Sequence, residues 1–209
     1  AQVVFYYKPT RNLQTLSESA LVEPYHTLSR SLEKITIGLR IVELLRALLE
    51  DEAPQPAVFA LTRDVLRRLD ATDARTANLW PYFQLRLAAA LGLAPSVERD
   101  AVKELPDEGG WLDLESGAVH PAGAAVPAAA RRTSRAALRA YGVFARAGLD
   151  DVMRMRLAPA LRREVEQVVD AYMHYQFESA YPSKCRRVVG QLLDREISPL
   201  LPPERSRTP

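Results

Sequence analysis

The chain has 209 residues, a formal net charge of +2 and a single cysteine. One cysteine excludes a disulfide framework within the chain and suits the reducing cytoplasm. No apolar run approaches the roughly 18 residues that a membrane span needs, and the first residues lack the features of a signal peptide. Because leucine, alanine and arginine dominate the composition, the chain is expected to be mainly helical.

The N-terminal segment has the composition of β-strands. Residues 3–7 form a β-branched and aromatic run that ends in a turn-like segment beginning at Lys8, and a second extended run covers residues 13–23. Two strands alone are marginal in water and cannot form a closed sheet. We therefore expect residues 1–24 to be the last strands of a β-domain whose earlier strands are absent from this sequence.

Helical periodicity begins at Thr27. Apolar residues then recur at intervals of three and four positions, namely Leu28, Leu32, Ile35, Leu39 and Val42. After a break at Pro54 and Pro56, a second helix is predicted over about residues 57–69. Its apolar residues available to the core are Phe59, Val65, Leu66 and Leu69.

The stretch from Leu79 to Pro95 is the clearest helical signal. Pro81 fits a first turn, and the segment is apolar on nearly every face, so this helix should be buried. Gly92 can adopt the left-handed conformation that ends a helix, and Leu93 can fold back onto the last turn.

A polar insert follows at residues 97–130, with Trp111 and Leu112 as its sizeable apolar anchors. Two pairs of residues lie near its two ends, and the members of each pair are separated by two residues. The pairs are Asp100 with Lys103, and His120 with Gly123. This layout is the spacing of a small zinc loop. Asp100 and His120 are possible ligands. However, Lys103 is a cation and Gly123 has no side chain, so we expect no metal.

The remaining sequence returns to helical periodicity. Ser134 is the predicted N-cap of a helix that carries Ala137, Leu138, Tyr141 and Phe144. A short helix near Asp150 and a long helix from Pro159 follow, and a last helix is predicted near residues 184–196. The expected organisation is a β segment at 1–24, a helical domain at 25–96 and 131–196 interrupted by the insert at 97–130, and a disordered tail at 197–209.

Several short motifs occur in order along the chain. They are residues 21–25, Glu43-Leu44-Leu45, Pro54-Gln55-Pro56 with Phe59, residues 83–95, Trp111 with residues 114–119, and Tyr175, Lys184, Arg186 and Arg187 followed by Gln191-Leu192-Leu193. The ordered set resembles RecO, a family of bacterial recombination mediators, and residues 83–95 are its most specific part. The resemblance extends from Val3 to Leu193.

The resemblance implies a mainly α fold. The end of an N-terminal oligonucleotide-binding (OB) barrel would be followed by a helical domain with a degenerate zinc-finger-like insert. The family's barrel has five strands, of which the last two are expected here. Many members carry two Cys-x2-Cys pairs, and the corresponding positions in this chain are Asp100, Lys103, His120 and Gly123.

Basic clusters are the candidate DNA-binding residues. Arg131, Arg132, Arg135 and Arg139 follow one another along a predicted linker and helix, with no acid near them in sequence. Lys8 and Arg11 lie at the turn between the strands, and Lys184, Arg186 and Arg187 form a later cluster. Such clusters bind phosphates without reading base sequence. A single cluster of this kind is often a solvated face, and the family resemblance is what favours DNA.

No catalytic centre is predicted. Cys185 lies between Lys184 and Arg186, which would favour its thiolate, but nothing places a histidine beside it. The chain also has no phosphate-binding glycine loop. No cofactor is therefore expected.

The resemblance implies a non-enzymatic protein of DNA repair and recombination, cytoplasmic and associated with the nucleoid. It would bind single- and double-stranded DNA, anneal complementary strands and help load RecA onto single strands coated by the single-stranded-DNA-binding protein (SSB). Expected partners are DNA, RecR and the acidic, apolar-ended tail of SSB, with no membrane. For that tail we predict a basic rim of Arg135 and Arg139 beside an apolar pocket formed by Leu138, Tyr141 and Phe144. Two alternatives stay open: a helical scaffold that does not bind DNA, and a metal-dependent enzyme.

Overall fold

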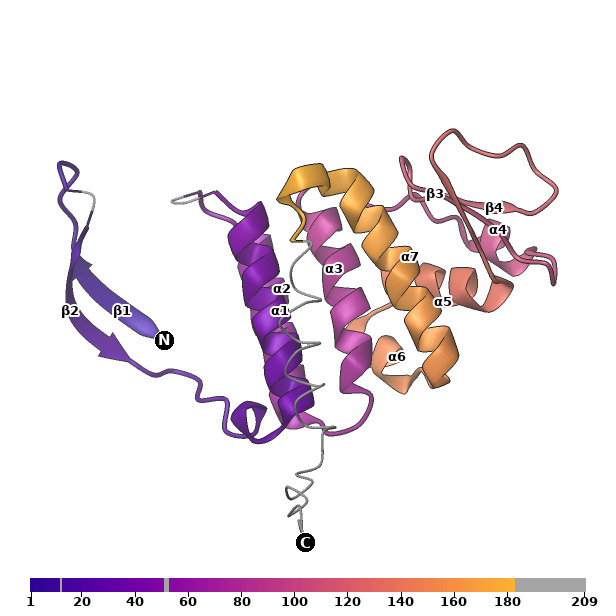
Figure 1. Ribbon diagram of the computed structural model, residues 1–209. Coiled ribbons are helices and arrows are strands. Elements are labelled where there is room, and N and C mark those ends of the chain that lie inside the picture. The colour runs from indigo at the N-terminus through magenta and orange to yellow at the C-terminus, as the bar shows by residue number, and fades with distance from the viewer. Residues whose placement is uncertain (12, 51–52, 183–209) are drawn as a thin grey trace, which may run out of the picture.

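The computed structural model describes residues 1–11, 13–50 and 53–182. Strand β1 (Gln2–Tyr6) pairs antiparallel with β2 (Thr15–Ala20), and this hairpin stands apart from a body of packed helices (Figure 1). Every residue of both strands is exposed. The N-terminal strands followed by a mainly helical body confirm the predicted fold class.

The segment after the hairpin is bound to the second long helix, α2 (Pro56–Ala71). Glu23 forms an ion pair with Arg67. Asp70 accepts hydrogen bonds from the backbone N–H groups of Thr27 and Leu28, at 2.7 and 2.8 Å, just where the short 3-10 helix η1 (Leu28–Arg30) begins. These contacts fix where the chain enters the helical body.

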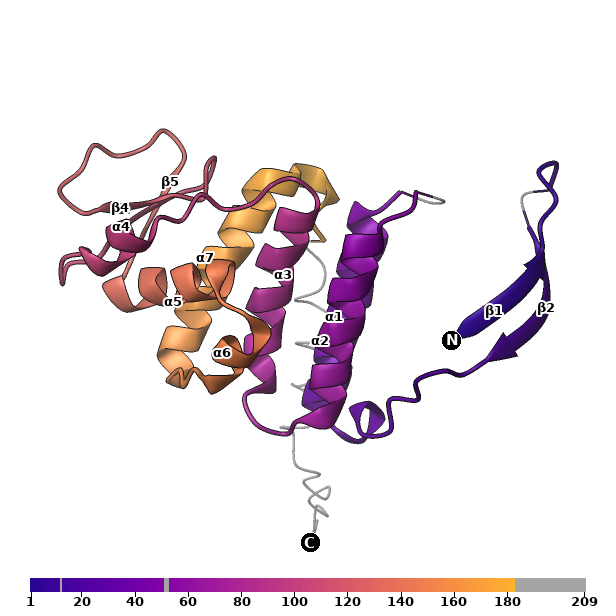
Figure 2. The same ribbon diagram turned by 180° about the vertical axis from the view of Figure 1, so that it is seen from behind.

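Helix α3 (Leu79–Ala90) is the central helix of the body (Figures 1 and 2). A 3-10 turn, η2 (Thr76–Asn78), leads into it. Its buried residues lie on all faces, which confirms the predicted burial. The helices that contact it are α1 (Leu32–Leu48), α2, α5 (Arg135–Arg146), α6 (Leu149–Arg154) and α7 (Pro159–Phe177).

The end of α3 is as predicted. Gly92 has a φ of 87°, its N–H donates to the Ala89 carbonyl at 3.1 Å, and the Leu93 N–H donates to the Ala88 carbonyl at 2.8 Å. These two bonds form a Schellman motif, which satisfies carbonyls that the helix end would otherwise leave unpaired. The Tyr172 hydroxyl donates to the Leu93 carbonyl at 3.0 Å and so ties this end to α7.

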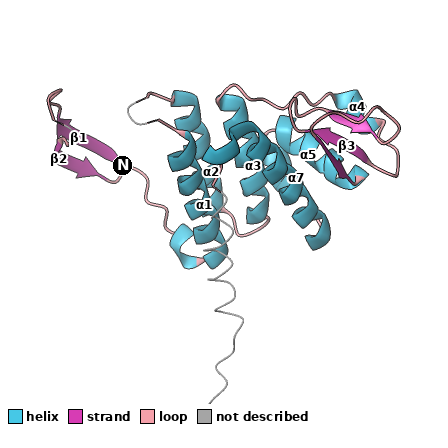
Figure 3. Cartoon of the chain, turned by 45° about the horizontal axis from the view of Figure 1, so that its top comes forward, coloured by secondary structure: helices cyan, strands magenta, loops and turns pink. Residues whose placement is uncertain are grey.

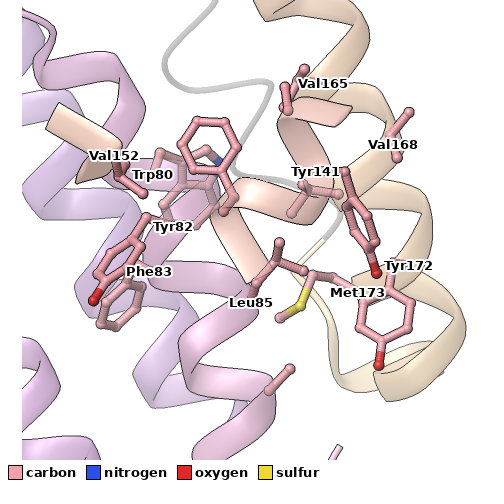
Figure 4. Packing of buried hydrophobic residues seen from close by; sticks show 14 of the residues in the cluster. Trp80, Tyr82, Phe83, Leu85, Tyr141, Val152, Val165, Val168, Tyr172 and Met173 are labelled. Atoms are coloured by element: carbon pink, nitrogen blue, oxygen red, sulfur yellow. The ribbon is translucent and has the colours of Figure 1, made fainter. Parts of the chain in front are cut away.

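The core continues between α3, α5 and α7 (Figure 4). The rings of Tyr141 on α5 and Tyr172 on α7 meet edge to face with centroids 6.2 Å apart. Burial raises the pKa of Tyr172 to about 12 and holds that of Tyr141 well above its usual range. Gln84 of α3 donates to Asp170 at 3.1 Å and to the Tyr181 hydroxyl at 2.5 Å, so a polar network closes the core beside the last 3-10 turn, η3 (Glu178–Ala180).

Two helix faces differ from the sequence pattern. On α1, Leu39 and Val42 are 55% and 49% exposed, and the buried positions are instead Lys34, Ile37, Gly38, Ile41 and Leu44. Helix α1 is apolar on two faces, and contact with α2 and α3 decides which one is buried. On α2, Phe59 is 69% exposed, so its predicted place in the core is wrong. Val58, Val65 and Leu69 form the buried face instead, and Phe59 lies to one side of it.

The insert lies at the end of the body away from the hairpin (Figure 3). It contains helix α4 (Arg99–Lys103) and a three-stranded antiparallel sheet in the order β4-β3-β5, made of β3 (Gly110–Asp113), β4 (Val119–Pro121) and β5 (Ala130–Thr133). Arg131 and Arg132 therefore lie in a strand that completes this sheet, and not in a linker as predicted. The predicted last helix and tail lie outside the described residues.

Candidate nucleic-acid interface

The insert sheet has one buried face and one outer face. Leu112 of β3 and Val119 of β4 are partners in the register and are buried in the core. The neighbouring register position pairs Trp111 with His120 on one side and with Arg132 on the other. Because side chains alternate along a strand, these three residues form one row across the outer face.

Arginine and tryptophan are in contact in this row. The guanidinium carbon of Arg132 lies 5.7 Å from the ring centroid of Trp111, within the range of a cation–π interaction. Arg132 is exposed and Trp111 is partly exposed. Arg132 is thus exposed to solvent with its guanidinium over the Trp111 ring.

Strand β5 also contacts α7. The Arg131 Nη2 lies 3.4 Å from the Gln167 Oε1 of that helix, and the exposed Arg163 lies one turn before Gln167 on the same helical face. Neighbouring residues on a strand point to opposite faces, so Arg131 lies on the side of β5 that contacts α7 and Arg132 on the outer face. We call the region that carries Arg131, Arg132 and Arg163 the β5–α7 surface. Among the described residues, none of these three arginines forms a salt bridge.

A carboxylate that the sequence did not single out, Glu164, holds this surface in place. It accepts hydrogen bonds from the Thr133 hydroxyl at 2.7 Å, the Ser134 N–H at 2.8 Å and the Ser134 hydroxyl at 2.7 Å. The Ser134 oxygen in turn accepts the Ala137 N–H at 3.2 Å, which confirms the predicted N-cap of α5. No periodicity or motif marks Glu164, because its role depends on a contact between β5 and α7.

Arg135 and Arg139 have a different environment from the one predicted. Arg135 forms an ion pair with Asp107, which the fold brings to it from 28 residues earlier in the chain. Arg139 donates to the carbonyls of Lys103 at 3.0 Å and Val102 at 3.4 Å, at the end of α4. Both arginines therefore connect α5 to the insert. No acid lies near the cluster in sequence, but the fold brings Asp107 to Arg135.

The predicted apolar pocket beside these arginines is also wrong. Leu138, Tyr141 and Phe144 are fully buried. The face of α5 that carries them packs against α3 and α7, so it offers no surface for a peptide.

The other predicted cations are not brought to this surface. Lys8 and Arg11 are exposed together in the hairpin turn, where the Arg11 N–H donates to the Lys8 carbonyl at 3.1 Å. The hairpin and the insert lie at opposite ends of the molecule (Figures 1 and 2). Lys184, Arg186, Arg187 and Cys185 lie outside the described residues.

The four zinc-loop positions are arranged as follows. Lys103 forms an ion pair with Asp100 across 3.1 Å, His120 lies in the outer row of the sheet, and Gly123 lies in the turn after β4. Within residues 1–11, 13–50 and 53–182, no group of three or more histidines, cysteines and acidic residues is placed to hold a metal ion. Over the same residues, no helix combines the length and apolar character that crossing a membrane requires.

Comparison with known proteins identifies the family. The family model described as "Recombination protein O C terminal" matches residues 29–184. The DNA repair protein RecO of Salinibacter ruber is 54% identical over 191 residues, which are 91% of this chain and 73% of the relative. The RecO of Chlorobium limicola is 31% identical over 62% of this chain and 51% of its own length, and that of Chloroherpeton thalassium is 23% identical over 91% and 78%. No solved structure matches the chain. On the family match and the Salinibacter relative, the chain belongs to the RecO family of DNA repair proteins.

Proposed function

We propose that this protein binds single- and double-stranded DNA, anneals complementary strands and helps load RecA onto SSB-coated single strands, without making or breaking a bond. The observation that carries the proposal is the β5–α7 surface. Arg131, Arg132 and Arg163 lie there without a salt bridge in the described part of the chain, although the charge of Arg131 helps to lower the pKa of Glu164; Arg135, by contrast, forms an ion pair with Asp107. Family membership supports a role in DNA repair.

The proposed mechanism is electrostatic. Arginines that contact phosphates release counterions and reduce the repulsion between two strands. Phosphate contacts fix the position of a strand but leave its base edges free to pair. Lys8 and Arg11 in the hairpin turn provide a second cationic position at the other end of the molecule, so two stretches of DNA can be bound without competing for one surface.

The proposed protein partners are RecR and the acidic tail of SSB, and the proposed location is the nucleoid. The β5–α7 surface would attract the acidic tail by charge. The apolar pocket predicted at Leu138, Tyr141 and Phe144 of α5 is not part of the proposal, because those residues are buried.

The proposal is tested with Arg131→Gln/Arg132→Gln and fluorescence anisotropy on labelled oligonucleotides across a salt series. For single strands each phosphate contact contributes about 0.7 to the slope of log K against log salt, so two lost contacts should reduce the slope by about 1.4. The matched control is Arg30→Gln/Arg46→Gln, which removes the same charge from exposed positions next to and on α1. The control should bind as the unchanged protein does.

Two results would overturn the proposal. Equal loss in both double variants would show that net charge alone matters. No binding of the unchanged protein at low salt would favour the scaffold alternative, for which Leu39, Val42 and Phe59 are among the exposed apolar residues of the helical body.

A further inference from the structure

We propose that Trp111, flanked by His120 and Arg132 on the outer face of the insert sheet, is a stacking platform for one unpaired base of single-stranded DNA. The inference rests on the proposed DNA binding and makes it more specific. It assigns to the insert a preference for unpaired over paired DNA that a phosphate-binding surface alone does not provide.

The position of Trp111 supports this role. Its neighbour Leu112 is fully buried and holds β3 to the core, so the sheet does not need a second large apolar side chain on its other face. Trp111 lies in the middle strand, and its register partners are an imidazole and a guanidinium. Adjacent strands are about 4.8 Å apart, so the three side chains are attached to the outer face over roughly 10 Å. The Arg132 guanidinium lies over the Trp111 ring.

Arg132 gives the platform its charge. Its guanidinium lies 5.7 Å from the Trp111 ring centroid and is exposed, so it can contact the phosphate next to a base that stacks on the indole. Aromatic platforms with adjacent cations bind single strands in this way with little sequence preference. In a duplex the faces of the bases are already stacked on each other, so the platform acts on unpaired bases.

The first test compares Trp111→Ala with Trp111→Phe by anisotropy, on a labelled oligothymidine and on a duplex of equal length. Loss of one stacked base should weaken oligothymidine binding by about tenfold. Duplex binding and the salt slope should stay unchanged, since no phosphate contact is lost. Trp111→Phe should retain most of the affinity, and Phe59→Ala, which removes an exposed aromatic ring on α2, should have no effect.

A second measurement follows the indole itself. The sequence has two tryptophans, and the other one, Trp80, is buried in α3. Emission of Trp111 in a Trp80→Phe variant should be quenched by oligothymidine and much less by the duplex. If that variant does not fold, the unchanged protein gives the same readout, because buried Trp80 does not contact DNA.

The outcomes separate the two proposals. If the unchanged protein binds no DNA at low salt, the proposed function and the platform both fail. If it binds, but Trp111→Ala binds oligothymidine equally well, only the platform is overturned. Equal weakening of single-strand and duplex binding by Trp111→Ala would also overturn it, because that result indicates a structural effect on the insert.

Discussion

A single carboxylate, Glu164, joins the insert sheet to two helices. It lies on α7, accepts hydrogen bonds from Thr133 at the end of β5, and binds Ser134, the N-cap of α5. Partial burial alone would raise the pKa of Glu164, but the hydrogen bonds from Ser134 and Thr133 outweigh it and hold the pKa below its usual value. The ionised carboxyl therefore stabilises the folded state.

We expect Glu164→Gln to lower the free energy of unfolding at pH 7 by about 1.5–3 kcal/mol, the usual range for hydrogen bonds to a charged group. Because the folded-state pKa is depressed, this stabilisation is fully present above the ordinary pKa near 4.5. It is lost as the pH falls through the folded-state value. Urea unfolding of the unchanged protein and of Glu164→Gln at pH 7 and near pH 3 measures the difference in the free energy of unfolding. That difference should be smaller near pH 3.

The control for this prediction is Glu108→Gln, at an exposed position in the insert. It should leave the free energy of unfolding unchanged at both pH values. A Glu164→Gln effect that is equal at pH 7 and near pH 3 would contradict the role assigned to the charge.

At the scale of the element, two glycines show the difference between backbone strain and steric clash. Gly92 ends α3 with a φ of 87°, and a Cβ there would meet nothing within 4 Å. Gly117 lies in the turn between β3 and β4 with a φ of 72°, and a Cβ there would lie 2.7 Å from Pro95. Both turns thus need a left-handed residue, but only the second also requires the absence of a side chain.

We expect Gly92→Ala to cost about 1–2 kcal/mol of stability, the usual cost of a left-handed non-glycine residue. Gly117→Ala should cost more, about 2–5 kcal/mol, because overpacking adds about 1–3 kcal/mol to the same strain. Thermal and urea unfolding of the two variants should show that Gly117→Ala is the less stable of the two. Equal costs would show that Pro95 moves aside without penalty.

The elements also show what a sequence can predict. The Schellman end of α3 and the N-cap at Ser134 depend on residues close in sequence, so local chemistry was sufficient to predict them. The buried face of α1 and the exposure of Phe59 depend on which neighbours the fold provides. In the candidate site, the ion pair of Arg135 with Asp107 depends on contact between segments 28 residues apart, which a basic run cannot reveal.

At the scale of the whole molecule, the hairpin and the helical body differ in what holds them. Both faces of β1 and β2 are exposed in this chain, so their backbone hydrogen bonds are accessible to water. A two-stranded hairpin is marginal in water by itself. The segment just after it is different, because Asp70 accepts the Thr27 and Leu28 N–H groups and Lys34, which is buried, donates to the Asp70 carbonyl at 3.2 Å.

We therefore expect three levels of amide hydrogen exchange in this chain. The amides of β1 and β2 should exchange fastest, those of Thr27 and Leu28 more slowly, and those of α3 slowest, since exchange protection follows the free energy of local opening. Asp70→Asn should increase exchange at Thr27 and Leu28 and leave the hairpin amides unchanged. The control is Asp64→Asn on the same helix, whose carboxylate contacts only arginine side chains among the described residues. Faster exchange throughout the hairpin in Asp70→Asn would contradict this prediction. It would show that the hairpin and the helical body open together as one cooperative unit when the junction is weakened.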